Sequence, residues 1–429
     1  MNRHLILFAI ILFVQQTSNI PAEENLLKSD AASFTFAATD WPWWRGPDRN
    51  GIAVPDQHPP MKWSESENVL WKSPVPGRGH SSPTVVGDQV FLATADFEKQ
   101  TQSVLCFDRK TGKQIWSTDV HRGGLEKKGN AKASHASSTV ACDGERLFIN
   151  FVNDGAAYTT ALTRDGKQIW QTKICDYVIH QGYGSSPAIY QSLVLVSADN
   201  KGGGAIAALD RKTGEFVWKH DRPKTPNYAS PIVLQIAGRE QLLFTGCDLV
   251  SSYEPLTGKK LWEIDGSTTE CVTSTVTDGK LMFTSGGYPT NHVSAVRADG
   301  SGEVVWKKDL RVYVPSMLIR NGYLYAVTDA GVAMCWKCDS GEEMWKQRLE
   351  GDFTSSPVFV GELMFATNEN GKTFIFKATP EACEVIAENK LGDESFATPT
   401  ICGDRIYIRV AEKKYGQRQE VLYCIGKSE

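Results

Sequence analysis

The chain has 429 residues, of which 41% are hydrophobic and 22% are charged. This composition is typical of a globular protein and excludes a disordered or collagen-like chain. The 46 Lys and Arg residues are nearly balanced by 50 Asp and Glu residues, which gives a formal net charge of −4. A dedicated nucleic-acid-binding protein needs a strongly basic face, so this balance argues against nucleic acid as a partner.

The first residues, MNRHLILFAIILFV, contain ten consecutive apolar residues from Leu5 to Val14. This stretch is too short to span a membrane as a helix, but it has the length of a signal-peptide core. We therefore predict a signal peptide at residues 1–22 and an N-terminal extension at residues 23–70. The protein should be exported, to the periplasm or the extracellular space, without a transmembrane segment after signal removal.

Short segments rich in Ser, Thr and Pro recur along the rest of the chain, as in HSSPTVV, GSSPAIY and TSSPVFV. They are spaced by 40 to 56 residues, which is in or near the range of propeller blades. Eight residues mark these openings: Ser82, Ser138, Ser186, Ser230, Ser274, Ser316, Ser356 and Thr398.

A second marker, a Gly turn followed four residues later by Trp, closes six of the repeats, as in KTGKQIW. The seventh repeat has Val385 at this position, and the eighth ends before a closing strand. An unmatched closing segment, NVLWKSPVPG around Trp71, precedes the first opening. We predict that this N-terminal strand completes the last blade.

Strand-like runs separated by tight Gly turns, such as VGDQVFLAT, fill each repeat. The sequence therefore predicts an all-β fold, an eight-bladed propeller of four-stranded antiparallel blades over residues 71–429. Large indole side chains on outer strands are expected to pack between blades rather than bind a ligand. This structural role is assigned to Trp71, Trp116, Trp170, Trp218, Trp262, Trp306 and Trp345.

The segments FDRKTGKQIW and LDRKTGEFVW, which end at Trp116 and Trp218, resemble the repeat of the PQQ-like, quinoprotein-type propeller family. The resemblance covers residues 71–429. It implies the propeller fold, and it includes both quinoprotein alcohol dehydrogenases and a non-catalytic outer-membrane assembly lipoprotein. The leader WPWWRGPDRNGIA, from Trp41 to Ala53, is also similar to the N-terminal segment of the dehydrogenases.

The cysteines depart from the pattern of the family's enzymes. Those enzymes carry two adjacent Cys beside the quinone, whereas no two of the ten Cys are adjacent here. Haem-binding members use C-x-x-C-H, but Cys335 and Cys338 are followed by Asp339. We assign no catalytic residue, expect neither a metal site nor a cofactor, and leave open whether the cysteines are buried thiols or form one or two disulfides.

In a propeller, the loops that lead into the opening strands gather at one mouth of the central channel. We expect the residues before these openings to form a funnel for a polar ligand. Two Lys- and Arg-rich loops, at 119–135 and 411–420, would form a basic patch if they lay on one face. The candidate ligand-binding residues are His80, His135, Tyr183, Tyr228, Glu270, Tyr313, Asp352 and Glu394.

Three functional hypotheses follow. The first is a non-catalytic scaffold that binds a small polar ligand, a saccharide or an envelope protein at the channel mouth. The second is a divergent PQQ-dependent dehydrogenase for an alcohol or sugar, with PQQ and Ca²⁺ in the channel near Tyr183 or Tyr313. The third is a polysaccharide-binding or envelope-assembly platform.

Overall fold

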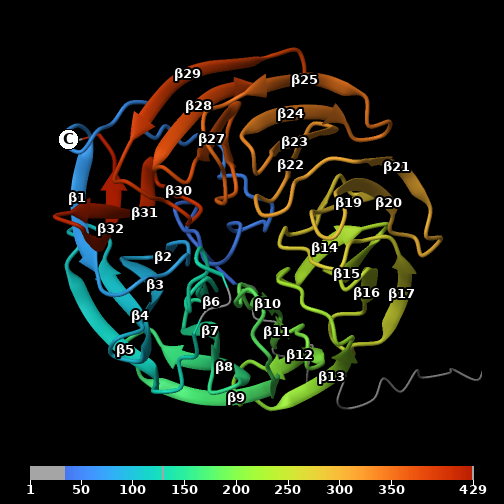
Figure 1. The fold of residues 1–429 in the computed structure, drawn as a ribbon, viewed down its shortest axis with the longest axis horizontal. Coiled ribbons are helices and arrows are strands. Elements are labelled where there is room, and N and C mark those ends of the chain that lie inside the picture. Colours follow the sequence, from blue (N-terminus) through green and yellow to red (C-terminus); the bar gives the residue numbers. More distant parts are fainter. Residues whose placement is uncertain (1–33, 128–129, 428–429) are drawn as a thin grey trace, which may run out of the picture.

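The computed structural model describes residues 34–127 and 130–427, and 32 strands in this part of the chain form eight four-stranded antiparallel sheets. The sheets are the blades of a closed propeller, arranged around a central channel (Figure 1). The predicted fold class is therefore confirmed. The predicted signal peptide lies outside the described residues. Within them, no helix is long and apolar enough to cross a membrane.

The first four blades each use four consecutive strands, counted outward from the channel. Blade I consists of β2 (Thr84–Val86), β3 (Gln89–Asp96), β4 (Thr101–Asp108) and β5 (Gln114–Arg122). Blade II consists of β6 (Ala141–Cys142), β7 (Arg146–Asn153), β8 (Ala156–Thr163) and β9 (Gln168–Asp176). Blade III consists of β10 (Ala188–Tyr190), β11 (Leu193–Ser197), β12 (Gly204–Asp210) and β13 (Phe216–Arg222). Blade IV consists of β14 (Ile232–Ile236), β15 (Arg239–Gly246), β16 (Leu249–Tyr253) and β17 (Lys260–Asp265).

The next three blades repeat this order, and the last one differs. Blade V consists of β18 (Val276–Thr277), β19 (Leu281–Gly286), β20 (His292–Arg297) and β21 (Val304–Lys308). Blade VI consists of β22 (Leu318–Arg320), β23 (Tyr323–Val327), β24 (Val332–Lys337) and β25 (Glu343–Arg348). Blade VII consists of β26 (Val358–Val360), β27 (Leu363–Thr367), β28 (Lys372–Ala378) and β29 (Cys383–Lys390). Blade VIII consists of β30 (Thr400–Cys402), β31 (Arg405–Lys414), β32 (Gln417–Ile425) and β1 (Val69–Val75).

The ring is closed by β1, the first strand of the chain. It pairs antiparallel with β32, with Trp71 opposite Cys424 and Ser73 opposite Leu422. In Figure 1 the blue β1 lies beside the red strands of the C-terminal end. The predicted completion of the last blade by the N-terminal strand is confirmed.

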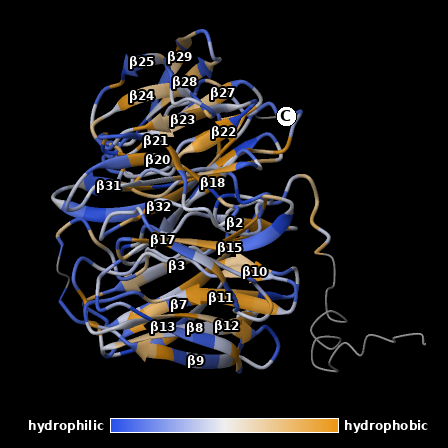
Figure 2. Ribbon diagram, turned by 90° about the vertical axis from the view of Figure 1, so that its right-hand side faces the viewer, coloured by the Kyte–Doolittle hydropathy of each residue, from blue (hydrophilic) through white to orange (hydrophobic). Residues whose placement is uncertain are grey.

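The middle strands of each blade are packed by neighbouring blades on both faces, so most of their residues are buried. All five residues of β11, LVLVS, are buried, whereas only two of the seven residues of the outer strand β13 are buried. Figure 2 shows the same division, with β10 and β11 largely orange and many connecting loops blue.

The residues that mark the repeats form a hydrogen-bonded ring around the channel. In seven places the backbone N–H of one marker donates to the hydroxyl oxygen of the next, at 2.9 to 3.1 Å. Blade II uses Thr139 rather than Ser138, so its repeat begins one residue later than expected. A side chain with a hydroxyl on Cβ can accept this bond, which explains the recurrence of Ser and Thr. The members of this hydroxyl ring are Ser82, Thr139, Ser186, Ser230, Ser274, Ser316, Ser356 and Thr398.

Seven tryptophans lie at the seams between blades. Six of them donate the indole N–H to a backbone carbonyl of the next blade, at 2.7 to 3.3 Å. At the seam between blades VIII and I, a Cβ on Gly112 would lie 2.4 Å from the Trp71 ring, and Gly112 has a φ of +72°. Only glycine fits both conditions. The seven residues are Trp71, Trp116, Trp170, Trp218, Trp262, Trp306 and Trp345.

The N-terminal leader, residues 34–68, crosses the ring before it enters β1. Trp41 exchanges backbone hydrogen bonds with Val85 of blade I, and the Ala53 N–H donates to the Phe359 carbonyl of blade VII at 2.7 Å. Between these points the Trp44 indole N–H donates to the Ser274 hydroxyl of the ring at 2.9 Å. In Figure 1 the blue leader runs through the centre of the propeller. The leader therefore spans the channel from one side to the other.

Candidate functional site

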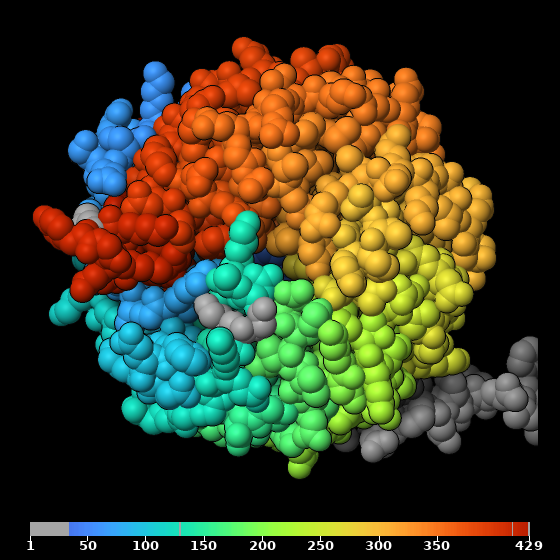
Figure 3. Space-filling view, viewed as in Figure 1, coloured from blue at the N-terminus to red at the C-terminus, as the bar shows by residue number. Residues whose placement is uncertain are grey.

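A cavity of about 600 Å³ lies at the mouth of the channel. Figure 3 shows this face of the molecule, with a hollow at the centre of the ring. The volume of the cavity is within the range of small-molecule binding sites. Five of the eight candidate residues line the cavity: His80, Tyr183, Tyr228, Glu270 and Tyr313.

The other three candidates lie outside this cavity, because their loops hold them elsewhere. His135 stacks on Phe97, with 5.6 Å between ring centroids, and lines a separate cavity of about 20 Å³. Asp352 is exposed to solvent. Glu394 forms ion pairs with Lys413 and Arg418 of blade VIII.

The most buried charged group of the funnel wall is the Glu270 side chain, which is 3% exposed. The Tyr313 hydroxyl donates to its Oε2 at 2.8 Å, and His180 Nε2 lies 3.3 Å from its Oε1. Both carboxylate oxygens are thus engaged by neighbouring side chains. Burial, together with the Glu270 charge, raises the pKa of Tyr228 and Tyr313 far above the usual phenol value, so both hydroxyls remain protonated.

Arginine and tyrosine side chains extend the wall beside this carboxylate. The Arg311 guanidinium lies 4.7 Å from the centroid of the Tyr313 ring and donates to the Gly287 carbonyl at 2.7 Å. Asp329 accepts the Tyr313 backbone N–H at 2.7 Å, and burial raises the pKa of this carboxyl group. Tyr288, 55% exposed, stands at the same wall. The wall is therefore aromatic and polar, with an arginine that is held in place.

The floor of the funnel combines the leader with the hydroxyl ring. Trp44 lines the cavity, and so do six ring members: Ser82, Thr139, Ser186, Ser230, Ser356 and Thr398. The role of Trp44 was not predicted, because the leader lies outside the repeats and nothing in its spacing relates it to the channel. The three tryptophans of the segment WPWW were the only feature of the sequence that could have pointed to it.

Several cations of the two basic loops have carboxylate partners, including Lys413 and Arg418 of the second loop, which both pair with Glu394. Lys132 lies 2.7 Å from Glu369, and Arg122 lies 2.6 Å from Asp119. These pairs neutralise much of the local positive charge. Among the described residues, the two loops therefore do not act as a simple basic patch, and Lys128 of the first loop is outside the described part.

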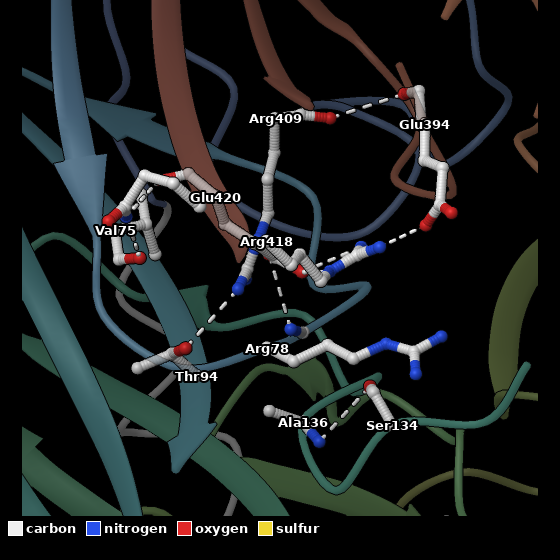
Figure 4. Close-up of polar contacts among 12 residues, drawn as sticks. Val75, Arg78, Thr94, Ser134, Ala136, Glu394, Arg409, Arg418 and Glu420 are labelled. Carbon is white, nitrogen blue, oxygen red and sulfur yellow. Dashed lines mark hydrogen bonds and ion pairs between the residues drawn. The ribbon is translucent and has the colours of Figure 1, made fainter. Parts of the chain in front are cut away.

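An ion network joins this rim to the seam between blades VIII and I (Figure 4). Arg409, buried on β31, pairs with Glu420 and donates to the Ala93 carbonyl of blade I at 2.7 Å. Arg418 binds the other oxygen of Glu420 at 3.0 Å and also pairs with Glu394. A buried ion pair of this kind needs several further hydrogen bonds to offset desolvation, and this one has them.

The cysteines do not contribute to the funnel. All ten are free thiols in the structure, and none lines the cavity. Burial raises the pKa of Cys142 and Cys402 to about 12, so both remain protonated and unreactive. No group of three or more His, Cys, Asp and Glu side chains in the described ranges is arranged to hold a metal ion.

These residues do not fit the quinone and Ca²⁺ that the resemblance implies for an enzyme. The buried carboxylate, Glu270, already has both oxygens engaged by Tyr313 and His180. The adjacent cysteines expected beside a quinone are not present in the sequence. No step of a quinone reaction is therefore derived from this site.

Comparisons with known proteins find relatives of two kinds, outer-membrane assembly factors and dehydrogenases. The family model described as outer membrane protein assembly factor BamB matches residues 100–287 and 289–379. BamB of Yersinia pestis is 23% identical over 389 residues, which cover 81% of this chain and 92% of that protein. A polyvinylalcohol dehydrogenase of a Pseudomonas species is 28% identical over 169 residues, 35% of this chain and 24% of that enzyme.

Solved structures show the same division. BamB from Moraxella catarrhalis has a TM-score of 0.57 and 14% identity, covering 83% of this chain and 96% of that one. A europium-containing methanol dehydrogenase has a TM-score of 0.66 and 12% identity, covering 94% and 100%. At these identities the structures establish the shared fold only. The match of the family model to well over half of the chain shows more: this chain is a PQQ-like repeat propeller that belongs to the family of the outer membrane protein assembly factor BamB.

Proposed function

We propose that this protein is an exported, non-catalytic scaffold of the bacterial envelope that binds a partner or ligand at its channel mouth and takes part in outer-membrane protein assembly. The observation that carries the proposal is the funnel itself. It offers a large aromatic and polar surface, while its buried carboxylate is engaged by Tyr313 and His180. Such a wall is suited to recognition rather than to proton abstraction.

The relatives support the envelope location. The proteins named as outer membrane protein assembly factors match 66% to 81% of this chain. The apolar segment from Leu5 to Val14 has the features of an export signal. Together these observations favour the periplasmic side of the envelope over the extracellular space.

The proposal is tested by site-specific photo-crosslinking in the source bacterium. A photoreactive amino acid replaces Tyr288, which is 55% exposed on the funnel wall, or Ile115, which is 52% exposed on the outer strand of blade I. We expect one envelope protein to be captured reproducibly from position 288 and not from position 115. Equal capture from both positions, or none from position 288, would contradict the proposal.

A deletion strain provides the second part of the test. Loss of the protein should lower the level of folded outer-membrane proteins, and the wild-type chain should restore it. A chain with Glu270→Gln and Tyr313→Phe, which removes the buried contact of the wall, should restore it incompletely. Full restoration by this chain would show that the funnel wall is not needed for the proposed function.

A divergent PQQ-dependent dehydrogenase is the second candidate, favoured by the leader and by the extent of the match to methanol dehydrogenase. The test is addition of PQQ and Ca²⁺ with a panel of alcohols and sugars, followed by reduction of an artificial dye. The scaffold proposal expects no turnover above a control without protein. Robust turnover would replace the scaffold function with the enzymatic one.

A further inference from the structure

The hydroxyl ring at the base of the funnel has hydrogen-bond donors left over. Seven of its eight oxygens accept a backbone N–H from the preceding blade, and the eighth, on Ser274, accepts the indole N–H of Trp44. A hydroxyl has one proton to donate in addition to the lone pairs that accept. Within the described chain, no ring hydroxyl donates to a protein acceptor.

Several of these donors are deeply buried, so leaving them unsatisfied would be costly. Ser82, Thr139 and Ser186 are each 3% exposed, and all three line the cavity. Buried hydroxyl groups are nearly always paired with protein, ordered water or ligand. Six of the eight ring residues line the cavity, so the base of the funnel offers hydroxyl donors to whatever occupies the channel.

Trp44 adds an apolar surface to this circle. Its N–H is engaged by Ser274, which fixes the indole at the level of the ring, and its side chain lines the cavity. Tyr183 and Tyr228 bring further aromatic surface and hydroxyl groups to the wall above. An aromatic surface surrounded by hydroxyl groups is complementary to a molecule with apolar C–H faces and an edge of hydroxyl groups.

The charged side chains around the cavity lie on its wall and rim, and each has a polar or aromatic neighbour. Glu270 lies beside His180, and Lys132 pairs with Glu369. Arg311 lies against the Tyr313 ring and donates to a backbone carbonyl. The base itself is formed by Trp44 and the hydroxyl groups of the ring and contributes no charged side chain, which favours a neutral ligand.

We propose that the base of the funnel is a subsite for one neutral sugar ring, which stacks on Trp44 and exchanges hydrogen bonds with the Ser and Thr hydroxyls of the ring. This subsite rests on the proposed function, since it names the ligand class of the same funnel. The cavity of about 600 Å³ leaves room above the ring for a continuing chain. The sugar is either free or the end of a glycan, and both present the same chemistry at the base.

The test is ligand-observed NMR with the purified protein. The probes are glucose, galactose, mannose and N-acetylglucosamine as free sugars, maltotriose as a short chain, and glucuronic acid as a charged analogue. We expect saturation transfer to the ring protons of at least one neutral sugar, with a dissociation constant on the order of 1 mM. Tighter binding of the trisaccharide would identify a chain end as the source, and equal binding would identify the free sugar.

Two tryptophans of the leader make a matched pair of variants. Trp44→Leu removes the aromatic floor and should weaken sugar binding about tenfold or more. Trp63→Leu alters a buried leader tryptophan that does not line the funnel, and it should leave binding unchanged. Thermal unfolding of both variants checks that they are folded.

Two results would overturn the subsite: no transfer to any neutral sugar at 10-fold the expected constant, or equal binding by wild type and Trp44→Leu. Stronger binding of glucuronic acid than of glucose would overturn its neutral character. A failure of this kind is distinguishable from failure of the scaffold function. Crosslinking from position 288 to an envelope protein would persist if only the sugar subsite were wrong.

Discussion

The seam between blades VII and VIII differs from the other seven. At a regular seam, a tryptophan on the outer strand of one blade packs on the turn that joins the third and fourth strands of the next. Blade VIII has no such turn, because β32 ends at Ile425 and β1 begins at Val69. The Gly426 N–H instead donates to the Asn68 carbonyl at 2.9 Å, between the two ends of the folded chain.

The residue at the tryptophan position of this seam is Val385, and the leader compensates for the missing indole. The Trp63 backbone N–H donates to Asn389 of β29 at 2.9 Å, and the Asn389 amide donates to the Met61 carbonyl at 2.9 Å. A groove of about 780 Å³ remains, lined by residues including Asn68 and Ile386. The difference teaches that the tryptophan of the repeat is missing beside blade VIII, the blade in which the two ends of the chain pair.

The largest expected effect is at a regular seam. Trp170→Ala removes an indole that is buried against Gly214 and donates to the Arg211 carbonyl at 3.3 Å. We expect the free energy of unfolding to fall by about 3–5 kcal/mol. Val385→Ala, at the equivalent but 39% exposed position, should change it by about 0.5 kcal/mol. Equal losses in chemical denaturation would show that the two seams are energetically alike.

Stability should depend nearly as strongly on the ion network at the seam between blades VIII and I. Arg409→Met leaves Glu420 buried beside Arg418 alone, and we expect a loss of about 3 kcal/mol in the free energy of unfolding. The double variant Arg409→Met, Glu420→Leu should recover part of this loss, because no buried charge is left uncompensated. A double-mutant cycle in urea measures the coupling, and additive losses would contradict it.

Acid should weaken the regular part of the ring through His292, which is fully buried on β20 of blade V. Burial lowers its pKa from 6.5 to about 4. The unfolded chain takes up the proton first as the pH falls, so stability is lost from about pH 6.5 down to pH 4, by roughly 3 kcal/mol. The variant His292→Gln should flatten this part of the stability–pH curve, and an unchanged slope would show that other groups dominate.

The seam between blades IV and V is joined by two successive hydrogen bonds through Gln241, and breaking them should have an intermediate effect on stability. The Trp262 indole donates to the Gln241 amide oxygen at 2.9 Å, and the Gln241 amide donates to the Ala298 carbonyl of blade V at 3.1 Å. Gln241→Met keeps the volume but leaves the indole N–H unpaired, which should cost about 1–3 kcal/mol. The exposed Gln235→Met on the neighbouring strand is the control and should cost almost nothing. Thermal unfolding of the two variants makes the comparison.

The smallest effect is expected where the leader replaces the tryptophan. Asn389→Ala removes both hydrogen bonds to the leader and should lower the free energy of unfolding by about 1 kcal/mol. It should also speed trypsin cleavage after Lys62, detected by mass spectrometry. Unchanged cleavage would mean that the leader is held at this seam by packing alone.

The propeller could be predicted because each blade repeats the same two contacts. The hydroxyl of the ring and the indole of the seam need a particular residue type in every repeat, so spacing alone gave eight blades and the closing strand. The sequence predicts Ser138 in the ring where the structure has its neighbour Thr139, because both residues carry a hydroxyl and only the backbone geometry selects one.

The funnel was less predictable because its residues differ from blade to blade. Positions before the openings were a good guide where loops are short, as at Tyr228 and Glu270. These positions did not predict the funnel where a long loop intervenes, as at His135. They also failed where a neighbouring cation attracts the side chain, as at Glu394. Arg311 and Tyr288 also line the wall, although neither lies directly before the opening of a repeat.

The pairing of β1 with β32 also sets an order of events during biogenesis. Ser73 and Leu422 are opposite each other across this pair although they lie near the two ends of the folded chain. Contacts between such distant segments form late, since a long loop must first be closed. A chain that crosses a membrane with its N-terminus leading would have to hold β1 unpaired until β32 emerges. Completion of the circle thus requires that translocation has nearly finished.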